Sequence, residues 1–440
     1  MNFQKNVWYG LFWIQFVIIF FYWFQGAGSL WELGTAGVFV GVGRLAGLIA
    51  TYLILLQFFL MSRFTLLERV FGLDRLSRFH QKNGKVAIGV LILHPFFLVL
   101  GYAGLSDRGY WAQFGSFTAD LGSVFLALLG LCLLLVVVGS ALYVIRSKVK
   151  YEWWYFVHLL AYMAVLFPIL HQFESGGTLS VSSVFYSYWI VLYIVVLAVH
   201  ILFRCARPVY LSYKHQFKVD RVVRETSDTI SIYFTGRDLE SFSIRSGQFM
   251  IIRFLTKGMW WQAHPFSISA MPNGKEIRIT VKELGDFTSE LQSVALGVRV
   301  IIDGPYGVFT NLFRVSSKVL MIAGGIGITP IRSLMEEMLK EEKDVVLLYA
   351  NRNDGSIVFK KELEDLEKRY NVKIVHIMSH QEGYAGERGY LDEEKVCRIV
   401  PDISDREVYL CGPVPMMNSL IPVVSSFVGK SRIHFEKFSF

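Results

Sequence analysis

The sequence predicts a multidomain membrane protein in which six membrane-spanning helices precede an antiparallel β-barrel and a parallel α/β domain. Hydrophobic residues make up 53% of its 440 residues, which is too apolar for an ordinary soluble protein. They are concentrated in the first half, whereas the second half has the composition of a globular protein. We expect the membrane bundle at residues 1–206, the barrel at 207–312 and the α/β domain at 313–440.

Six apolar runs are long enough, or nearly so, to cross a bilayer. The first run follows a single basic residue, Lys5, and carries bulky aromatic side chains throughout. We therefore interpret it as a retained span and not as a cleaved signal peptide. The six runs are Trp8–Phe24, Val38–Met61, Val86–Gly104, Leu121–Ile145, Trp153–Leu170 and Val184–Phe203.

Basic residues indicate how the spans are oriented. Lysine and arginine are concentrated in the Arg63–Lys85 loop, after the fourth span and after the sixth span, whereas the alternate loops hold almost none. Because cytoplasmic loops carry the excess of basic residues, we expect the N-terminus and the second half in the cytoplasm, below a plasma (inner) membrane. This distribution explains the net charge of +8 better than nucleic-acid binding does, so the expected partner is the lipid bilayer.

Four histidines lie on the third and fifth spans. His80 and His94 are 14 residues apart, which is roughly 20 Å along a helix. His158 and His171 are 13 residues apart, so each pair has one member near each face of an apolar core about 30 Å thick. Ionisable residues inside a membrane mark functional sites, and neutral imidazole ligates haem iron. We predict that the four hold two haems, one above the other; the alternative for any single histidine is an interhelical hydrogen bond.

Span orientation also predicts which histidines face each other. The third and fifth spans both run outwards, so His80 pairs with His158 near the cytoplasm. By the same argument, His94 pairs with His171 towards the exterior. On an ideal helix, a spacing of 14 residues brings His80 and His94 within roughly 40° of the same face, whereas a spacing of 13 residues leaves His158 and His171 about 140° apart. Pro168 lies between the latter and should distort that helix.

Three other features bear on metal binding. His200, near the cytoplasmic end of the sixth span, is the rival inner ligand. Arg44 lies in the outer part of the second span, where burying an unpaired guanidinium in the bilayer costs free energy. We expect that its partner is a haem propionate; the alternative is that its side chain reaches the outer surface. The four cysteines are too scattered for an iron–sulfur cluster, zinc site or disulfide framework.

The composition changes near Arg207–Pro208, and short alternating runs broken by Gly, Asn and Asp follow. This pattern predicts an antiparallel barrel of about six strands. The runs include Phe217–Val223, Thr229–Phe234, Gln248–Phe254, Glu276–Lys282 and Arg299–Ile302.

After Lys318 strands alternate with helices, which predicts a parallel α/β nucleotide-binding domain. The expected strands are Val319–Ala323, Val345–Ala350, Lys373–Met378, Glu407–Cys411 and Ile433–Phe438. The expected helices are Pro330–Lys340, Val358–Arg369 and Pro415–Phe427.

The sharpest motif is Gly324–Pro330 (Gly-Gly-Ile-Gly-Ile-Thr-Pro), which connects an apolar strand to a helix. Glycines let backbone amides approach a pyrophosphate, and a helix N-terminus favours its negative charge. Proline suits the first turn of that helix. In this strand–turn–helix context the motif predicts a nucleotide phosphate site.

Two further motifs lie in the barrel region. His264–Ser269 (His-Pro-Phe-Ser-Ile-Ser) ends a strand, and alternation puts every second residue from His264 on one side. Lys282–Thr288 (Lys-Glu-Leu-Gly-Asp-Phe-Thr) contains a turn at Gly285 and leads into a helix expected over Phe287–Val294. The start of that helix could accept a second pyrophosphate.

Together these features resemble the superfamily of NADPH oxidases and ferric reductases, over nearly the whole chain from about Arg44 to Phe440. The histidine pairs are similar to that family's two bis-histidine b haems. The His264 and Gly285 motifs resemble its FAD segments, and Gly324–Pro330 and Cys411-Gly412-Pro413 resemble its two nicotinamide-cofactor motifs. The resemblance assigns FAD contacts to His264, Pro265, Phe266, Ser267, Lys282, Gly285, Phe287 and Thr288, and nicotinamide-cofactor contacts to Gly324, Gly325, Gly327, Thr329, Cys411 and Gly412.

The resemblance implies a ferredoxin–NADP reductase-like module attached to the membrane bundle, with FAD, two haem b groups and NADPH or NADH as cofactors. Electrons would pass from the nicotinamide to FAD as hydride, then singly to the inner haem, the outer haem and an external acceptor. The tail from His434 to Phe440 resembles that of ferredoxin reductases, whose aromatic residue covers the flavin until the nicotinamide displaces it. Phe438 and Phe440 share a strand face, and either fits that role.

Cofactor choice depends on the end of the second strand of the α/β domain. Arg352 follows that strand, where the 2′-phosphate of NADPH would lie; the alternative is a surface arginine. No acidic residue ends the strand, which favours NADPH, whereas the nearby Asp354 keeps NADH open.

The identity of the final electron acceptor distinguishes three functional hypotheses. They are an oxidase that makes superoxide outside, a reductase of ferric or cupric chelates, and an electron-transfer subunit for an external partner protein. Some family oxidases have a further histidine one turn after the outer ligand, where this chain has Leu98, so Arg44 remains as the cationic partner for oxygen. The outer loops show no pattern typical of a metal-chelate site. We expect the oxidase, working without regulatory subunits as the shorter bacterial members do.

Overall fold

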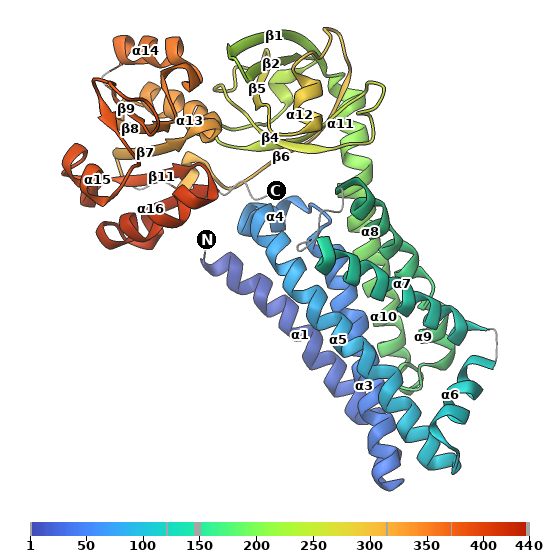
Figure 1. The fold of residues 1–440 in the computed structure, drawn as a ribbon. Helices are drawn as coiled ribbons and strands as arrows, with labels where there is room; N and C mark the ends of the chain where they lie inside the picture. Colours follow the sequence, from blue (N-terminus) through green and yellow to red (C-terminus); the bar gives the residue numbers. More distant parts are fainter. Residues whose placement is uncertain (1, 120–121, 145–150, 314–315, 371, 437–440) are drawn as a thin grey trace. The chain divides into compact units, whose positions relative to one another are not determined.

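The computed structural model describes residues 2–119, 122–144, 151–313, 316–370 and 372–436 (Figure 1). It forms two units, Met1–Cys205 and Ala206–Phe440. The first is helical, and the second contains the strands. The finer division into three domains at residues 206 and 312 stays a prediction.

In the described part of the first unit, six helices are long and apolar enough to cross a membrane, as predicted. Their outward side chains, such as Val17 and Phe24, are exposed and apolar, which suits a lipid-facing surface. The spans are α1 (Asn2–Gly26), α3 (Gly34–Leu60), α5 (Leu73–Ser106), α7 (Ser123–Val144), α8 (Tyr151–Leu166) with α9 (Ile169–Ser175), and α10 (Ser183–His200).

Two of these spans differ from ideal helices where the histidines require it. Helix α5 begins at Leu73, so it includes the polar stretch that carries His80, and it continues through Pro95. The fifth span is broken: α8 ends at Leu166 and α9 begins at Ile169, with Pro168 before it. The distortion predicted at this proline is therefore a two-residue break between α8 and α9.

Small residues hold α3 against α5. A Cβ atom added at Gly43 would lie 2.9 Å from the side chain of Leu98, and one added at Gly101 would lie 2.6 Å from that of Val40. Glycine at such positions lets two helix backbones approach closely. The glycine-rich α3 therefore packs along the helix that carries two of the four predicted ligands.

Several short elements of the first unit were not predicted. The sixth span continues beyond His200 as a π-helical turn, Ile201–Ala206. The other additions are α2 (Gly28–Trp31), α4 (Thr65–Phe71), α6 (Tyr110–Ala119) and a 3₁₀ turn at Leu179–Val181.

The second unit begins with α11 (Arg207–His215), which the sequence did not indicate. Six antiparallel strands follow, as predicted for the barrel. They form two three-stranded sheets, β1-β2-β5 and β4-β3-β6, around a core that includes Phe217, Phe234 and Phe254. The helix expected over Phe287–Val294 is shorter, α12 (Asp286–Leu291). The strands are β1 (Lys218–Thr226), β2 (Thr229–Thr235), β3 (Phe249–Phe254), β4 (His264–Ser267), β5 (Ile277–Lys282) and β6 (Val300–Tyr306).

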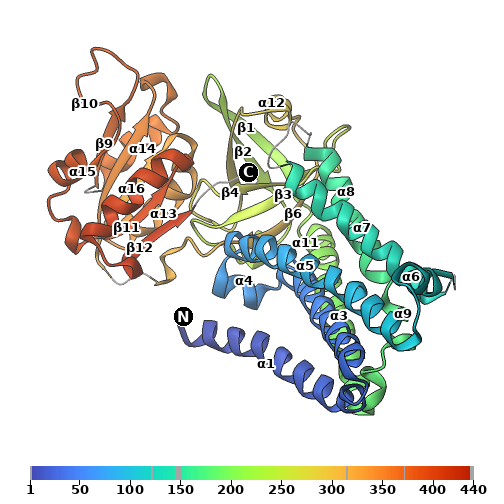
Figure 2. The same cartoon turned by 60° about the horizontal axis from the view of Figure 1, so that its bottom comes forward.

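The rest of the second unit is a six-stranded parallel sheet in the order β10-β9-β8-β7-β11-β12. Figure 2 labels β9, β10, β11 and β12 of this sheet. The parallel sheet confirms the predicted α/β class; β10 and α15 are the elements that the sequence did not indicate. The strands are β7 (Lys318–Gly324), β8 (Asp344–Asn351), β9 (Val372–Met378), β10 (Glu387–Arg388), β11 (Glu407–Cys411) and β12 (Ile433–Glu436), and the helices are α13 (Ile328–Lys340), α14 (Lys360–Arg369), α15 (Glu393–Ile399) and α16 (Val414–Phe427).

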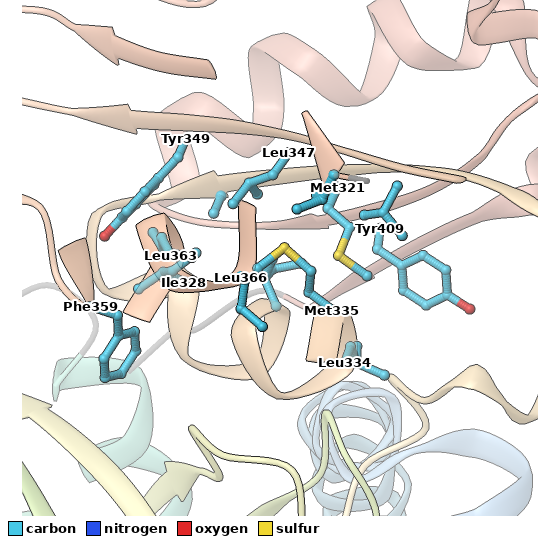
Figure 3. Packing of buried hydrophobic residues seen from close by; sticks show 14 of the residues in the cluster. Met321, Ile328, Leu334, Met335, Leu347, Tyr349, Phe359, Leu363, Leu366 and Tyr409 are labelled. Carbon is cyan, nitrogen blue, oxygen red and sulfur yellow. The ribbon is translucent and has the colours of Figure 1, made fainter. Parts of the chain in front are cut away.

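Both faces of this sheet are buried. On one face Met321 and Leu347 pack against α13 and α14, as Figure 3 shows. On the other face Ile322 and Leu348 pack against α15 and α16. A strand covered on both sides is apolar at every position, which explains why β7 and β8 are continuous apolar runs.

Candidate functional site

The structure brings His80 of α5 and His158 of α8 together. Their ring centroids are 6.0 Å apart, with 64° between the ring planes. A metal–imidazole bond is about 2 Å long, so two imidazoles that bind one metal ion from opposite sides have ring centres roughly 6 Å apart. The Nδ1 atom of His158 is buried without a hydrogen-bond partner. The spacing of this pair therefore fits two imidazoles that would together hold one haem iron.

His94 of α5 and His171 of α9 form the second pair. Their ring centroids are 6.2 Å apart, with 61° between the planes. His94 Nδ1 is hydrogen-bonded to the backbone oxygen of Gly43 at 2.8 Å, which leaves its Nε2 for a metal. A Cβ atom at Gly47 would lie 2.6 Å from the same Nδ1. Two glycines of α3 therefore make room for this imidazole and orient it.

The break at Pro168 explains how two histidines 13 residues apart face the same helix. An ideal helix would turn His158 and His171 about 140° from each other. Because α9 starts a new helix after Pro168, both rings lie opposite rings of α5. The two pairs are separated by 14 residues of α5, or roughly 21 Å.

His200, the rival inner ligand, has both ring nitrogens engaged by the protein. Its Nε2 is 3.0 Å from the hydroxyl of Tyr162, and its Nδ1 is 2.9 Å from the backbone oxygen of Phe58. No free nitrogen remains for a metal. The structure therefore favours the interhelical hydrogen-bond interpretation for this histidine.

A cavity of about 360 Å³ adjoins the second pair and is lined by His94, His171 and Arg44. The guanidinium of Arg44 donates a hydrogen bond to the Tyr102 hydroxyl at 3.2 Å, and in the described part of the chain no carboxylate pairs with it. Leu98 also lines this cavity. A cation that has no acidic partner among the described residues, beside the pair of His94 and His171, fits an anionic oxygen, such as a carboxylate.

The predicted flavin residues of β4 surround one phenyl ring. His264 stacks on Phe287 of α12 at 3.9 Å between centroids, and Phe266 lies at 6.5 Å from the same ring. The hydroxyl of Ser267 is buried and has no hydrogen-bond partner. A polar atom left buried in this way costs free energy unless something else satisfies it, so the motif fits a cofactor with hydroxyl groups.

The second flavin segment uses its polar groups partly within the protein. The hydroxyl of Thr288 accepts hydrogen bonds from the amides of Leu284 and Gly285 at 2.8 and 3.0 Å. Lys282 forms an ion pair with Asp228 at 3.2 Å. No atom lies within 4 Å of a Cβ added at Gly285. Thr288 and Lys282 thus shape the start of α12, while the space above Gly285 is open.

Both nicotinamide-cofactor motifs meet at the carboxyl ends of β7 and β11. A Cβ atom at Gly327 would lie 2.4 Å from the backbone oxygen of Cys411, and one at Gly412 would lie 3.1 Å from the Gly324 nitrogen. The glycines therefore allow two turns to cross. Ligands of parallel α/β sheets bind at this edge, so the contact places both motifs where a dinucleotide is expected.

Gly325 has a different role within the same turn. Its φ is +51°, a left-handed conformation, and no atom lies within 4 Å of an added Cβ. The hydroxyl of Thr329 donates a hydrogen bond to the Ile326 backbone oxygen at 3.0 Å and closes the first turn of α13. The open space over Gly325 at the start of a helix fits a phosphate group.

Comparison with known families supports this combination. The description "Ferric reductase like transmembrane component" matches residues 46–169, "FAD-binding domain" matches 214–310, and "Oxidoreductase NAD-binding domain" matches 321–420. The chain has the architecture of the NADPH oxidase and ferric reductase superfamily. It combines a transmembrane component of the ferric reductase type with an FAD-binding domain and an oxidoreductase NAD-binding domain.

Individual relatives of this ferric reductase-like chain match about half of its length. The glycine betaine monooxygenase reductase subunit of Chromohalobacter salexigens is 29% identical over 52% of this chain and 64% of its own length. Flavohemoprotein B of Dictyostelium discoideum is 28% identical over 51% of this chain and 59% of its own length. The chain thus spans less than two thirds of these curated relatives. The FAD/NAD-binding domain of nitric oxide dioxygenase from Vibrio cholerae, a solved structure, covers 50% of this chain and 97% of its own length, with 24% identity and a TM-score of 0.45.

The end of β8 in the NAD(P)H domain carries the predicted cofactor-choice residues. Arg352 is exposed just beyond the strand. Asp354 forms an ion pair with Lys360 at 2.7 Å, and this hydrogen bond holds the pKa of Lys360 above its ordinary value. The carboxylate that would favour NADH therefore already has a cationic partner.

A buried ion-pair network joins the FAD barrel to the NAD(P)H domain, which the sequence did not indicate. Arg278 of β5 binds both carboxylate oxygens of Glu362 of α14, and Arg332 of α13 lies 2.8 Å from the same carboxylate. Burial works against ionisation of Glu362, but the hydrogen bonds and charge of Arg278, followed by Arg332, hold its pKa below the ordinary value. The network is thus ionised and fixes the two domains to each other.

The two aromatic residues proposed to cover the flavin, Phe438 and Phe440, lie outside the described residues. Strand β12 is Ile433–Glu436, and the last two residues of the predicted strand Ile433–Phe438 also lie outside the described residues. Sequence reasoning also missed Gln172 and Tyr193, which line the outer cavity. The signal available for Gln172 was its position next to His171, two residues beyond the predicted fifth span; Tyr193 is one of several aromatic residues in α10.

Proposed function

We propose that this chain is an NAD(P)H oxidase that carries electrons from cytosolic NAD(P)H across the plasma (inner) membrane to dioxygen and releases superoxide outside. The observation that carries the proposal is the pair of facing histidine couples, whose ring centroids are 6.0 and 6.2 Å apart. They lie one above the other along α5 in a membrane domain of the ferric reductase type. Each couple would hold one haem b through its two imidazoles, and the haem would supply single-electron transfer.

The residues have distinct roles in this proposal. When bound, FAD accepts hydride, and the haems pass single electrons. His80 with His158, and His94 with His171, hold the haems at a separation set by α5. His264, Phe266, Phe287 and the open Gly285 turn support the flavin; the glycine turns with Thr329, Cys411 and Gly412 support NAD(P)H. Each NAD(P)H then yields NAD(P)⁺, one proton and two superoxide anions from two dioxygen molecules.

Residues at the two ends of the electron-transfer path select the electron donor and the electron acceptor. Arg44 lines the outer cavity without a carboxylate partner in the described structure, which supports a role in attracting oxygen as it gains charge. At the cytoplasmic end, Arg352 is exposed and Asp354 is paired with Lys360, which supports NADPH over NADH. Phe438 or Phe440 would cover the flavin until the nicotinamide arrives.

Reduction of ferric chelates is the second candidate, because the matched transmembrane family is named for it. The deciding experiment is cytochrome c reduction by the purified, FAD-supplemented protein with NADPH in air, with and without superoxide dismutase. Loss of the signal with dismutase is the expected result. A signal that dismutase leaves unchanged, or haems that reduce and reoxidise only with ferric chelate, would overturn the oxidase proposal. Dependence on an added partner protein would favour an electron-transfer subunit.

A further inference from the structure

Next to His171, three polar side chains form a short chain between α9 and α10. The indole N–H of Trp189 donates to Gln172 Oε1 at 3.0 Å, and Gln172 Nε2 donates to the Tyr193 hydroxyl at 2.8 Å. Trp189 and Tyr193 are buried, with 0% and 6% of their surface exposed. These three hydrogen-bonded side chains therefore lie within the packed core of the membrane unit.

The direction of these hydrogen bonds is determined by chemistry. An indole N–H is a donor only, so the oxygen of the Gln172 amide must face it. The amide nitrogen, which cannot accept, then faces Tyr193. The hydroxyl oxygen of Tyr193 is consequently the acceptor, and its own hydrogen is left over. In the described part of the chain this hydroxyl makes no second hydrogen bond, although a buried tyrosine hydroxyl ordinarily has a partner.

The surroundings of Tyr193 show what kind of group would accept that hydrogen. Tyr193 and Gln172 line the same cavity as His94, His171 and Arg44. No aspartate or glutamate is among the described residues of its wall. The cavity thus combines a cation with a hydroxyl whose hydrogen is free, and it has no negative charge of its own. Such a wall favours an oxygen anion.

We propose that the Tyr193 hydroxyl is a fixed hydrogen-bond donor to an oxygen anion in the outer cavity, and that Trp189 and Gln172 set its direction. The inference rests on the proposed function for the identity of that anion. Two sources share this chemistry: the propionate of a haem held by His94 and His171, or dioxygen as it becomes superoxide. Tyr193 is a binding residue in either case, and Gln172 and Trp189 are positioning residues.

The test is Tyr193→Phe in the full-length, detergent-solubilised protein, since this change removes only the hydroxyl. Tyr188→Phe is the matched control, because Tyr188 lies on the same helix and donates to Gln15, outside the cavity wall. Haem content is measured first by pyridine haemochrome. Both variants are expected to keep two haems and the wild-type rate of flavin reduction by NADPH.

Two measurements then identify the anion. If Tyr193 binds a propionate, the variant's outer haem has a more negative midpoint potential in a redox titration, because a less neutralised carboxylate stabilises ferric iron. If Tyr193 binds the reduced oxygen, the potential stays the same and the KM for oxygen rises roughly tenfold, as expected for a lost hydrogen bond to a charged group.

A Tyr193→Phe protein whose potential and oxygen KM both equal those of Tyr188→Phe and wild type would overturn the inference. The proposed function is tested separately by superoxide formation in the wild type. A wild type that reduces ferric chelate and makes no superoxide refutes the oxidase, yet the potential of the outer haem in Tyr193→Phe still decides whether the hydroxyl donates to a propionate.

Discussion

Glu362 is the carboxylate on which two buried arginines depend, and its replacement by glutamine tests how the FAD and NAD(P)H domains are held together. The side chains of Arg278 and Arg332 are 3% and 11% exposed, and that of Glu362 is 32% exposed. Glu362→Gln keeps the shape and one oxygen acceptor but removes the negative charge. Arg332 retains its ion pair with Glu336, whereas Arg278 has no other carboxylate among its described partners.

The expected cost follows from the burial of Arg278. Removing one partner of a buried ion pair destabilises a protein by about 3–5 kcal/mol, because the remaining charge is left without compensation. Glu362 is partly accessible, so water replaces some of its interaction with Arg278. We therefore expect the lower end, about 3 kcal/mol. At about 2–4 °C per kcal/mol for a domain of this size, the midpoint of thermal unfolding should fall by roughly 6–12 °C.

The assay follows release of FAD by its fluorescence during heating, with stopped-flow reduction of FAD by NADPH at a temperature where the variant is folded. We expect slower FAD reduction and unchanged haem content, since the network lies between the domains that exchange hydride. Glu387→Gln is the control, because Glu387 pairs with an exposed arginine, Arg398, and exposed pairs contribute little. A Glu362→Gln protein with wild-type melting and wild-type FAD reduction would refute the argument.

Three further outcomes are expected. His94→Ala should lose one of two haems by pyridine haemochrome, whereas His200→Gln, whose parent has both nitrogens bound by the protein, should keep both. Gly325→Val forces a β-branched side chain to φ +51°, so steady-state kinetics should show a KM for NADPH roughly tenfold higher or more, with haem and flavin content unchanged. Arg406, helped by Lys318, lowers the pKa of Asp402 from 3.8 to about 2; because the folded-state pKa is the lower one, its stabilisation is present above pH 3.8 and lost as the pH falls towards 2. Asp402→Asn should therefore be less stable at neutral pH and show a smaller loss over that range in acid unfolding.

The elements most readily predicted are those whose burial forces a pattern on the sequence. Strand β7 is covered on both faces, so its residues Val319–Ala323 form an unbroken apolar run. Such a run predicts a buried strand of a parallel sheet, and hence the α/β domain. The spans are recognisable for a different reason, because their lipid-facing side chains are also apolar. Helix α5, however, begins at Leu73 in a polar stretch, because a helix that leaves the apolar core needs no apolar residues to continue.

The residues that were missed are defined by contacts between distant segments. Arg278 and Glu362 are 84 positions apart, and each alone is an ordinary charged residue of a strand or helix. Strand β10 has only two residues, Glu387 and Arg388, too few for any periodicity. Spacing identified the four membrane histidines, but the rotation between His158 and His171 depended on how the chain resumes after its proline.

That interruption makes the two histidine couples unequal. His158 lies inside the 16-residue helix α8, whose backbone hydrogen bonds continue on both sides of it. His171 lies on α9, which has only seven residues, and so short a helix has little stability of its own. Its orientation therefore depends on side-chain contacts such as those of Gln172 with Trp189 and Tyr193. His171 is thus held in place by side chains where His158 is held by helix backbone. Truncation of Trp189, which removes the hydrogen bond to Gln172 Oε1, should therefore disturb the haem at His171 before the one at His158, whereas Tyr193→Phe keeps that bond and should leave both haems in place.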